Sequence, residues 1–390
     1  MEPRTIDRLP RVSLRFTRLA TSTLEAKNSG LRFLIRPTCY LLTIISVIRI
    51  RVMNGQPLTP EEINEAIRTR YIAIMGPAFF PENATQLDVI KLFASLLRVV
   101  GMEDRGWDPY MESRAVIDDL YAIMQMGDLP EARFRDRDLT KWRVGLLFYS
   151  HIVEMSAPYE VLTNLLRFRL GKGYSPNPYH DFMSEQERKR FKRSGIYPKQ
   201  KIAIIKKLSE EAGLKIAEVF DEFYSNDFRN AIAHSDFIFT DEGFRCRNGN
   251  WMRSFQLTYQ QVDDFLTKAK VFIGTFFGLE REARRMWGEH AGKGMAYDPH
   301  YKGIMEVLVD AEGLMNGFKV HWPNNSESTY RRTDDGIDMT NCMLDLKNAT
   351  LNLFVDRYAI SPGSFSPLVE DGAEPVYTRL DDGEIPKWQP

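Results

Sequence analysis

The sequence predicts a mainly α-helical protein, because helix-start patterns are frequent, apolar stripes follow them, and strand-like alternation is rare. Thr59-Pro60-Glu61-Glu62 combines a capping hydroxyl, a proline at the first helical position and two acids that face the helix dipole. Ser184-x-x-Glu187 and Thr258-x-x-Gln261 have the spacing of capping boxes, in which each side chain bonds the other residue's backbone. We therefore expect helices over most of the chain after residue 52.

Length and composition set the outer limits of the prediction. The 390 residues exceed one average domain, so two or three folded units are expected. A hydrophobic content of 43% and a charged content of 27% are normal for globular proteins. Because the net charge is only −1, any surface that binds nucleic acid must be a local patch. The three widely spaced cysteines form no CxxC pair, which favours the reducing cytoplasm.

The first 52 residues differ from the rest, with ten Lys or Arg against three acids. The apolar run Cys39–Ile48 is too short to span a bilayer, so no membrane association is expected. Arg49 and Arg51 follow it where a signal peptide would have small residues. A transit peptide is the weaker alternative. We interpret this stretch as a disordered or non-native extension, with Met53 opening the folded protein.

Periodicity and breaks predict the individual helices. The expected helices cover residues 86–100, 112–126, 140–170 with a kink at Pro158, 185–193, 199–212, 214–234 and 258–287. Asp236–Leu257 alternates in hydrophobicity and contains two turn dipeptides, Glu242-Gly243 and Asn248-Gly249, so a β-hairpin is expected before the last helix.

Signals weaken toward the C-terminus. Phe318–Trp322 alternates as a strand does, while Asp338–Tyr358 fits a helix and a strand equally well. The expected organisation is a basic extension, a helical N-terminal domain, a helical bundle with a hairpin insertion, a small α+β region and an acidic Pro/Gly-rich tail. Their boundaries are 1–52, 53–139, 140–290, 291–360 and 361–390.

One short motif carries the functional hypothesis, Arg229-Asn230-Ala231-Ile232-Ala233-His234. Asn230 and His234 are four residues apart, so they share a helix face and their side chains can touch. Arg229 lies about 140° away from His234 around an ideal helix. Its long side chain must therefore reach round the helix, or it must meet a histidine of another subunit.

These residue types suit cleavage of RNA without a metal, because RNA supplies its own nucleophile, the 2′-hydroxyl. His234 can move protons near neutral pH, and Arg229 can hold the phosphate with its planar guanidinium. Asn230 can fix the orientation of the histidine ring. The alternative is structural: a histidine in the last helical turn favours the negative end of the dipole, and Asn and Ser nearby terminate helices.

The motif follows an aromatic-rich helix and precedes Ser235-Asp236-Phe237, and it resembles the signature of the HEPN superfamily. The resemblance extends over about 140–288, under half of the chain. It implies a helical bundle and a metal-independent endoribonuclease that acts as a homodimer, with two motifs facing each other across a two-fold axis. Many members serve in toxin–antitoxin or phage-defence systems, where an antitoxin or regulatory protein is a further partner. Others are inactive, which leaves a silent module binding a partner protein or nucleotide as the alternative.

RNA phosphates have one further candidate site, the basic segment 167–207, which holds twelve Lys or Arg and three acids. A solvated helix face is an equally good interpretation. Neither metal nor cofactor is expected, because HExxH and paired Cys/His spacings are absent and Gly171-Lys172-Gly173 lacks the rest of a P-loop. The densest part of the basic segment is Arg188, Lys189, Arg190, Lys192 and Arg193.

Overall fold

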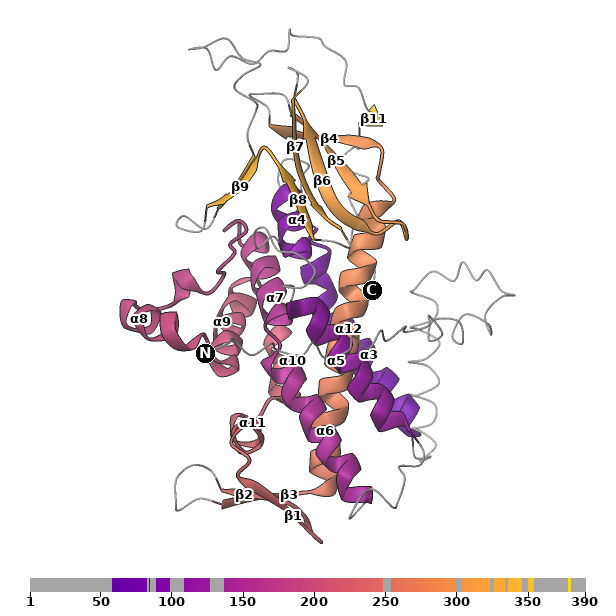
Figure 1. Cartoon of the computed structure of the whole chain (residues 1–390), viewed down its shortest axis with the longest axis vertical. Helices are drawn as coiled ribbons and strands as arrows, with labels where there is room; N and C mark the ends of the chain where they lie inside the picture. Colours follow the sequence, from indigo (N-terminus) through magenta and orange to yellow (C-terminus); the bar gives the residue numbers. More distant parts are fainter. Residues whose placement is uncertain are drawn as a thin grey trace, which may run out of the picture.

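In the computed structural model, a helical body stands between two β-sheets (Figure 1). A six-stranded sheet covers one end, and a three-stranded sheet lies at the other. The predicted mainly helical fold is therefore confirmed. The structure describes residues 58–82, 84, 89–98, 109–126, 137–247, 254–298, 303–322, 326–333, 336–345, 350–353 and 378–379. The predicted extension 1–52 and most of the tail 361–390 lie outside these residues.

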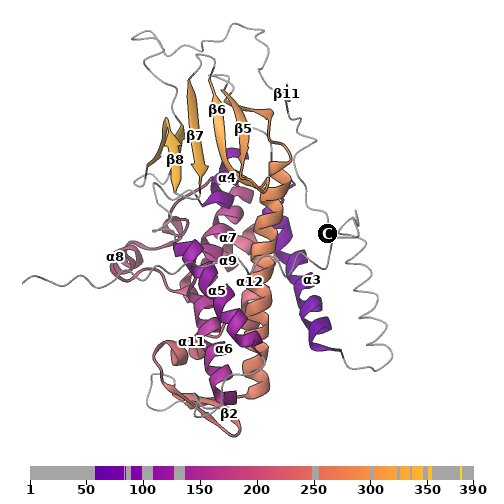
Figure 2. The same ribbon diagram turned by 45° about the vertical axis from the view of Figure 1, so that its right-hand side comes forward.

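The central element is α12, Tyr259–Gly288, which begins at the predicted capping box. The Gln261 backbone N–H donates to Thr258 Oγ1 at 3.2 Å, and the Thr258 N–H donates to Gln261 Oε1 at 2.9 Å. Figure 2 shows α3, Pro60–Phe79, running beside it. Helices α6, Arg137–Glu154, and α10, Ile216–Phe223, also pack against α12.

The remaining helices cover this core. Helix α4 packs on α7, α5 on α6, α9 on α7 and α10, and α11 on α6. The expected boundary between 139 and 140 therefore separates helices that share one core. The bounds are Val89–Leu97 for α4, Pro109–Gln125 for α5, Ser156–Arg169 for α7, Glu185–Ser194 for α8, Pro198–Glu211 for α9 and Asn226–Ala233 for α11, with a 3₁₀ turn η3 at His180–Phe182.

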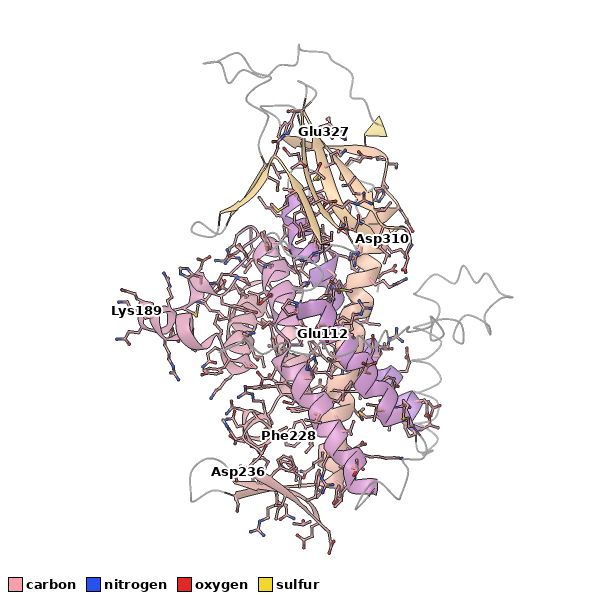
Figure 3. All side chains as sticks on the ribbon, viewed as in Figure 1. Glu112, Lys189, Phe228, Asp236, Asp310 and Glu327 are labelled. Carbon is pink, nitrogen blue, oxygen red and sulfur yellow. The ribbon has the colours of Figure 1, made fainter. Side chains whose placement is uncertain are left out.

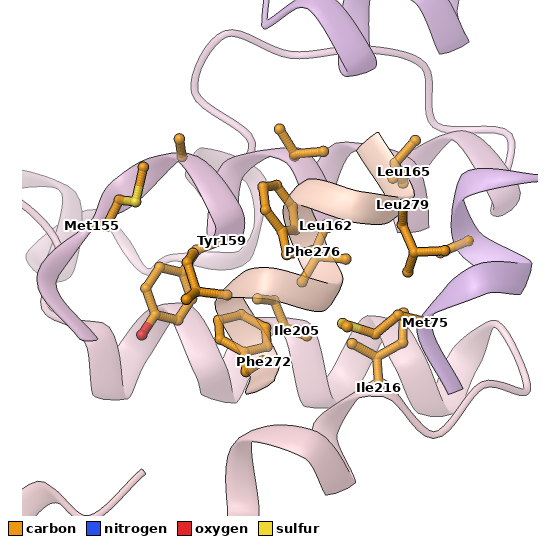
Figure 4. Close-up of a cluster of buried hydrophobic side chains, with 14 of the residues drawn as sticks. Met75, Met155, Tyr159, Leu162, Leu165, Ile205, Ile216, Phe272, Phe276 and Leu279 are labelled. Carbon is orange, nitrogen blue, oxygen red and sulfur yellow. The ribbon is translucent and has the colours of Figure 1, made fainter. Parts of the chain in front are cut away.

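Aromatic and aliphatic side chains from several helices fill the core (Figure 4). Phe272 of α12 lies between Phe220, with ring centroids 5.1 Å apart, and Phe223, 4.8 Å away. Tyr159 of α7 stacks on Phe220 at 5.4 Å. Each fully buried side chain of this size contributes about 1.5–3 kcal/mol. Met75 of α3 lies in the same cluster, so the first and last helices of the body are held by shared burial.

Two predicted helices are each divided in two. The stretch 140–170 is broken at Met155, whose extended backbone (ψ 117°) precedes α7, and not at Pro158. Pro158 lies in the first turn of α7, where its missing N–H breaks no helical hydrogen bond. The stretch 214–234 is broken at Tyr224, and Ser225 starts α11 by accepting a hydrogen bond from the Phe228 N–H at 3.3 Å.

The expected hairpin is present and is extended by a third strand. Strands β1, Phe237–Thr240, and β2, Gly243–Arg247, pair antiparallel around the predicted turn. β3, Ser254–Thr258, pairs with the other edge of β2 and leads directly into α12. The Phe244 ring lies 5.0 Å from that of Phe228, so this sheet packs against α11.

All regular elements described between residues 293 and 353 are strands, where the sequence predicted a mixed α+β region. The expected strand at 318–322 is confirmed within β6, and the ambiguous stretch 338–358 forms strands where it is described. The sheet order is β11-β4-β5-β6-β7-β8, antiparallel except for β11, which lies in the predicted tail and pairs parallel with β4. The bounds are Lys293–Asp298 (β4), Gly303–Val309 (β5), Met315–His321 (β6), Glu327–Arg332 (β7), Ile337–Thr340 (β8), Cys342–Asp345 (β9), Thr350–Leu353 (β10) and Thr378–Arg379 (β11).

The six-stranded sheet is fixed to the helical body at α4 and at the end of α12. Trp287 is buried edge-on against Phe93 of α4, with ring centroids 4.9 Å apart. Arg332 of β7 donates to the carbonyl oxygens of Leu97 at 2.7 Å and Arg98 at 2.9 Å. Among the described helices, none is long and apolar enough to cross a membrane.

The junction between α12 and the sheet leaves no room for a side chain at Gly288. A Cβ there would lie 2.0 Å from the Gly313 carbonyl oxygen, a backbone atom that cannot rotate away. We expect Gly288→Ala to destabilise the protein by about 1–3 kcal/mol. Gly274→Ala on the same helix, where a Cβ meets nothing within 4 Å, should stabilise by about 0.5–1 kcal/mol. Urea unfolding midpoints measure both, and equal shifts would contradict the close contact.

Candidate catalytic motif at the end of helix α11

Helix α11 is held in place by one buried aromatic side chain. Phe228 packs with its ring centroid 4.9 Å from Tyr149 of α6 and 5.3 Å from Phe265 of α12. Figure 3 labels Phe228 at this junction, beside the three-stranded sheet. Ala231 and Ile232 complete the buried side of the helix. The three motif side chains thus belong to a helix whose position is set by the body of the protein.

The helix ends in a tight reversal immediately after His234. The Ser235 N–H bonds the Ile232 carbonyl at 3.1 Å, and the Asp236 N–H bonds the Ala231 carbonyl at 2.9 Å. These two bonds form a Schellman motif, which requires a left-handed residue at Ser235, and its φ is +54°. His234 is exposed, and its ring forms no hydrogen bond or ion pair with the described residues. The ring is therefore free to exchange protons with solvent or a ligand.

Arg229 is engaged by an acid that the sequence analysis did not identify. Its Nε donates to Oε1 of Glu154, the last residue of α6, and its Nη1 donates to Asn230 Oδ1 at 2.9 Å. The side chain of Arg229 is 16% exposed and that of Glu154 is 40% exposed. The hydrogen bond that Arg229 donates to the Glu154 carboxylate raises the pKa of the guanidinium, so this side chain stays charged.

The hydrogen bond at Asn230 differs from the one expected. The sequence predicted that Asn230 orients the His234 ring, whereas its Oδ1 accepts from Arg229. A charged donor forms the stronger hydrogen bond with an amide oxygen, which accounts for this choice. Within one chain the motif thus divides into an engaged Arg229–Asn230 pair and a separate His234.

Two tyrosines, Tyr224 and Tyr197, and the Glu154 carboxylate lie near Arg229. Tyr224, whose pKa is raised mainly by burial, lies near enough to interact electrostatically with Arg229 and Glu154. Its hydroxyl lies 3.3 Å from Asn226 Oδ1. The Tyr149 hydroxyl donates to the Phe223 carbonyl at 3.0 Å, which fixes the break between α10 and α11. Arg229 thus provides a fixed positive charge, and Glu154 competes with any anionic ligand for it.

The predicted RNA-binding residues lie on α8, which protrudes from the body (Figure 1). Figure 3 shows Lys189 at its outer edge, where Nζ bonds Glu185 Oε1 at 2.7 Å. Arg188 Nε donates to the Met183 carbonyl at 3.0 Å, and the Arg190 guanidinium lies 5.7 Å from the Phe191 ring centre. The side chains of Lys192 and Arg193 lie outside the described residues. Helix α8 keeps both interpretations open, a phosphate-binding surface and a solvated face.

In the part of the chain that the structure describes, no three His, Cys, Asp or Glu side chains gather as a metal site requires. Comparisons of the chain with protein-family models, curated proteins and solved structures found no match. The HEPN assignment therefore remains a prediction carried by the motif.

The left-handed backbone at Ser235 makes the end of α11 sensitive to side-chain branching. We expect Ser235→Val to destabilise the protein by about 1–2 kcal/mol, because a β-branched residue is strained at positive φ. Ser235→Gly removes the Cβ and should be at least as stable as the natural chain. Chemical unfolding followed by circular dichroism measures both variants. If valine is tolerated as well as glycine, the reversal after His234 has been misassigned.

Proposed function

We propose that the protein is a metal-independent, HEPN-type endoribonuclease, with its active site at Arg229, Asn230 and His234. The exposed His234 ring, which has no partner among the described residues and follows a firmly anchored helix, is the observation that carries this proposal. A histidine with this freedom can accept and return protons near neutral pH. The charged Arg229, five residues earlier in the chain, supplies the fixed cation.

The proposed reaction is a transfer within the RNA. Neutral His234 takes the proton of the 2′-hydroxyl while its oxygen bonds to phosphorus. The bond from phosphorus to the 5′-oxygen breaks, and that oxygen takes a proton from a protonated histidine. Arg229 holds the non-bridging oxygens as negative charge develops, and Asn230 orients the guanidinium. The products are a 2′,3′-cyclic phosphate and a 5′-hydroxyl.

A homodimer would bring together the Arg229 and His234 side chains that are separate within one chain. In one chain Arg229 is directed to Glu154, and it is not linked to His234 by any hydrogen bond among the described residues. Two copies of the motif across a two-fold axis would provide a second histidine as the acid. The resemblance further implies a cytoplasmic toxin or phage-defence enzyme, restrained by an antitoxin or regulatory protein. The bundle would then comprise α6, α7 and α9–α12.

The role of His234 is tested by substitution. We expect His234→Ala to lower RNA cleavage in the presence of a metal chelator by about 100-fold or more, because no other described residue of the motif can transfer a proton. His321→Gln, in the distant six-stranded sheet, should cleave as the natural chain does. Gel analysis of a labelled RNA, with identification of cyclic phosphate ends, gives the readout. Full cleavage by His234→Ala would refute the assignment.

Glu154 should act as a competitor of RNA for Arg229. Replacing it with glutamine removes the negative charge that engages the guanidinium, so Glu154→Gln should tighten RNA binding by about fivefold. Glu218→Gln, which changes an exposed glutamate on the neighbouring helix α10, should leave the dissociation constant unchanged. Fluorescence anisotropy at fixed salt measures both. Weaker binding by Glu154→Gln would mean that the acid orients Arg229 instead of competing with RNA.

A second candidate is a catalytically silent module that binds a partner protein or nucleotide. The Arg229–Glu154 ion pair favours it, because an engaged arginine is less available to a scissile phosphate. This alternative predicts no cleavage of any RNA and no effect on cell growth. Growth arrest by the natural chain, but not by His234→Ala, would exclude it.

A further inference from the structure

A cavity of about 770 Å³ opens between α7, α8 and the start of α9. Its wall includes Ser156 at the beginning of α7, the loop that precedes η3, and Arg188 and Lys189 of α8. Ser156 lies two residues after Glu154, the acid that engages Arg229. The cavity wall is thus two residues along the chain from the acid that engages Arg229, and none of the motif residues lines it.

Two polar side chains that line the cavity are almost completely buried. Lys201 is 6% exposed, and its Nζ donates to Ser156 Oγ at 2.7 Å. Tyr179 is 3% exposed, and its hydroxyl has almost no accessible surface and lies near the Thr163 hydroxyl. The Thr163 hydroxyl donates to the Tyr159 carbonyl at 2.6 Å and still has lone pairs that can accept. The buried polar pair that a ligand in the cavity can meet is therefore Lys201 with Ser156.

Two helices begin at this wall without a side-chain cap. Helix α7 starts at Ser156 after Met155, and α9 starts at Pro198 after Tyr197, and neither preceding side chain accepts a backbone N–H. Because Pro198 has no N–H, the first N–H groups that can meet an anion are those of α7, while the positive dipole ends of both helices favour negative charge. Helix α8 differs, because the Glu187 N–H donates to Ser184 Oγ at 3.3 Å.

The wall carries three basic side chains, Arg188, Lys189 and Lys201, against the two acids Glu160 and Glu185. Burial lowers the pKa of the Lys201 ammonium, while the nearby carboxylates of Glu160 and Glu154 raise it and favour the charged form. The rings of Tyr159 and Tyr179 lie 5.5 and 5.9 Å from Nζ, which also stabilises a cation. Arg188 and Lys189 add positive charge at the wall, and Glu185 is already paired with Lys189.

We propose that this cavity binds the terminal phosphate group of an RNA, with Lys201 and Ser156 as its ligands. This inference rests on the proposed ribonuclease function, since it names the end of the substrate that the protein recognises. A terminal phosphate has only one substituent, so it can enter the cavity and reach the buried Lys201. An internal phosphodiester continues into a nucleotide on each side, and these nucleotides keep it away from this lysine. A bound end would place the following nucleotides beside Glu154 and Arg229.

The test measures binding without cleavage, in the full chain carrying His234→Ala. Fluorescence anisotropy compares oligoribonucleotides of one sequence with a 5′-phosphate, a 3′-phosphate or hydroxyl ends. We expect one phosphorylated end to bind about tenfold more tightly than the hydroxyl form. Lys201→Met should abolish this preference and Ser156→Ala should reduce it. Lys199→Met, an exposed lysine two positions away on α9, should retain it.

The outcomes separate this inference from the proposed function. Equal affinity for phosphorylated and hydroxyl ends overturns the inference, even when the natural chain cleaves RNA. A lost preference in the Lys199→Met control overturns it too, because the effect would be one of overall charge. Suppression of the preference by millimolar inorganic phosphate supports a phosphate site, and suppression only by a free phosphate ester shows a small-molecule site instead. If folded Lys201→Met keeps the preference, the cavity is not the site. If Lys201→Met fails to fold, Ser156→Ala decides, and an unchanged preference in that variant overturns the inference.

Discussion

The one-sided burial of α12 determines where everything else in the protein can lie. A helix of 30 residues is about 45 Å long, and its apolar side must be covered along that whole length. Helices α3, α6 and α10 provide this cover, and the two sheets adjoin its ends. Because Phe265 of α12 packs on Phe228, the candidate active site takes its position from the same helix. The motif therefore lies on a helix that packs directly against α12, the central helix of the fold.

Features that depend on residues three or four apart were predictable from the sequence. The capping boxes at Ser184 and Thr258 form as expected, because both partners belong to one helical turn. The breaks at Met155 and Ser225 were missed, since distant contacts help to fix them. The Ser225 N–H, for example, lies 3.4 Å from the Tyr149 hydroxyl, 76 residues away. The third strand was missed for the same reason, since β3 is short and is defined by its pairing with β2.

The candidate site shows the same difference between local and distant contacts. The sequence singles out Arg229, Asn230 and His234 because they are adjacent, but it gives no sign of Glu154, which is 75 residues from Arg229. The contact between Ser156 and Lys201 spans 45 residues and was equally invisible. A single sequence shows the local spacing of residues but not the contacts that packing creates between distant residues. The acid that restrains the arginine, and the cavity beside it, could therefore be found only in three dimensions.

The contact between α3 and α12 also governs how the chain can be made. Residues 80–258 separate these two helices, yet Tyr71, Met75 and Phe79 of α3 are buried in the core that α12 completes. During synthesis, α3 leaves the ribosome long before α12, which covers it, has been made. At synthesis rates of about 5–20 residues per second, its apolar side waits on the order of ten seconds or more. The nascent helix is thus a natural target for a chaperone, and the polypeptide completes its helical core only after α12 has been made.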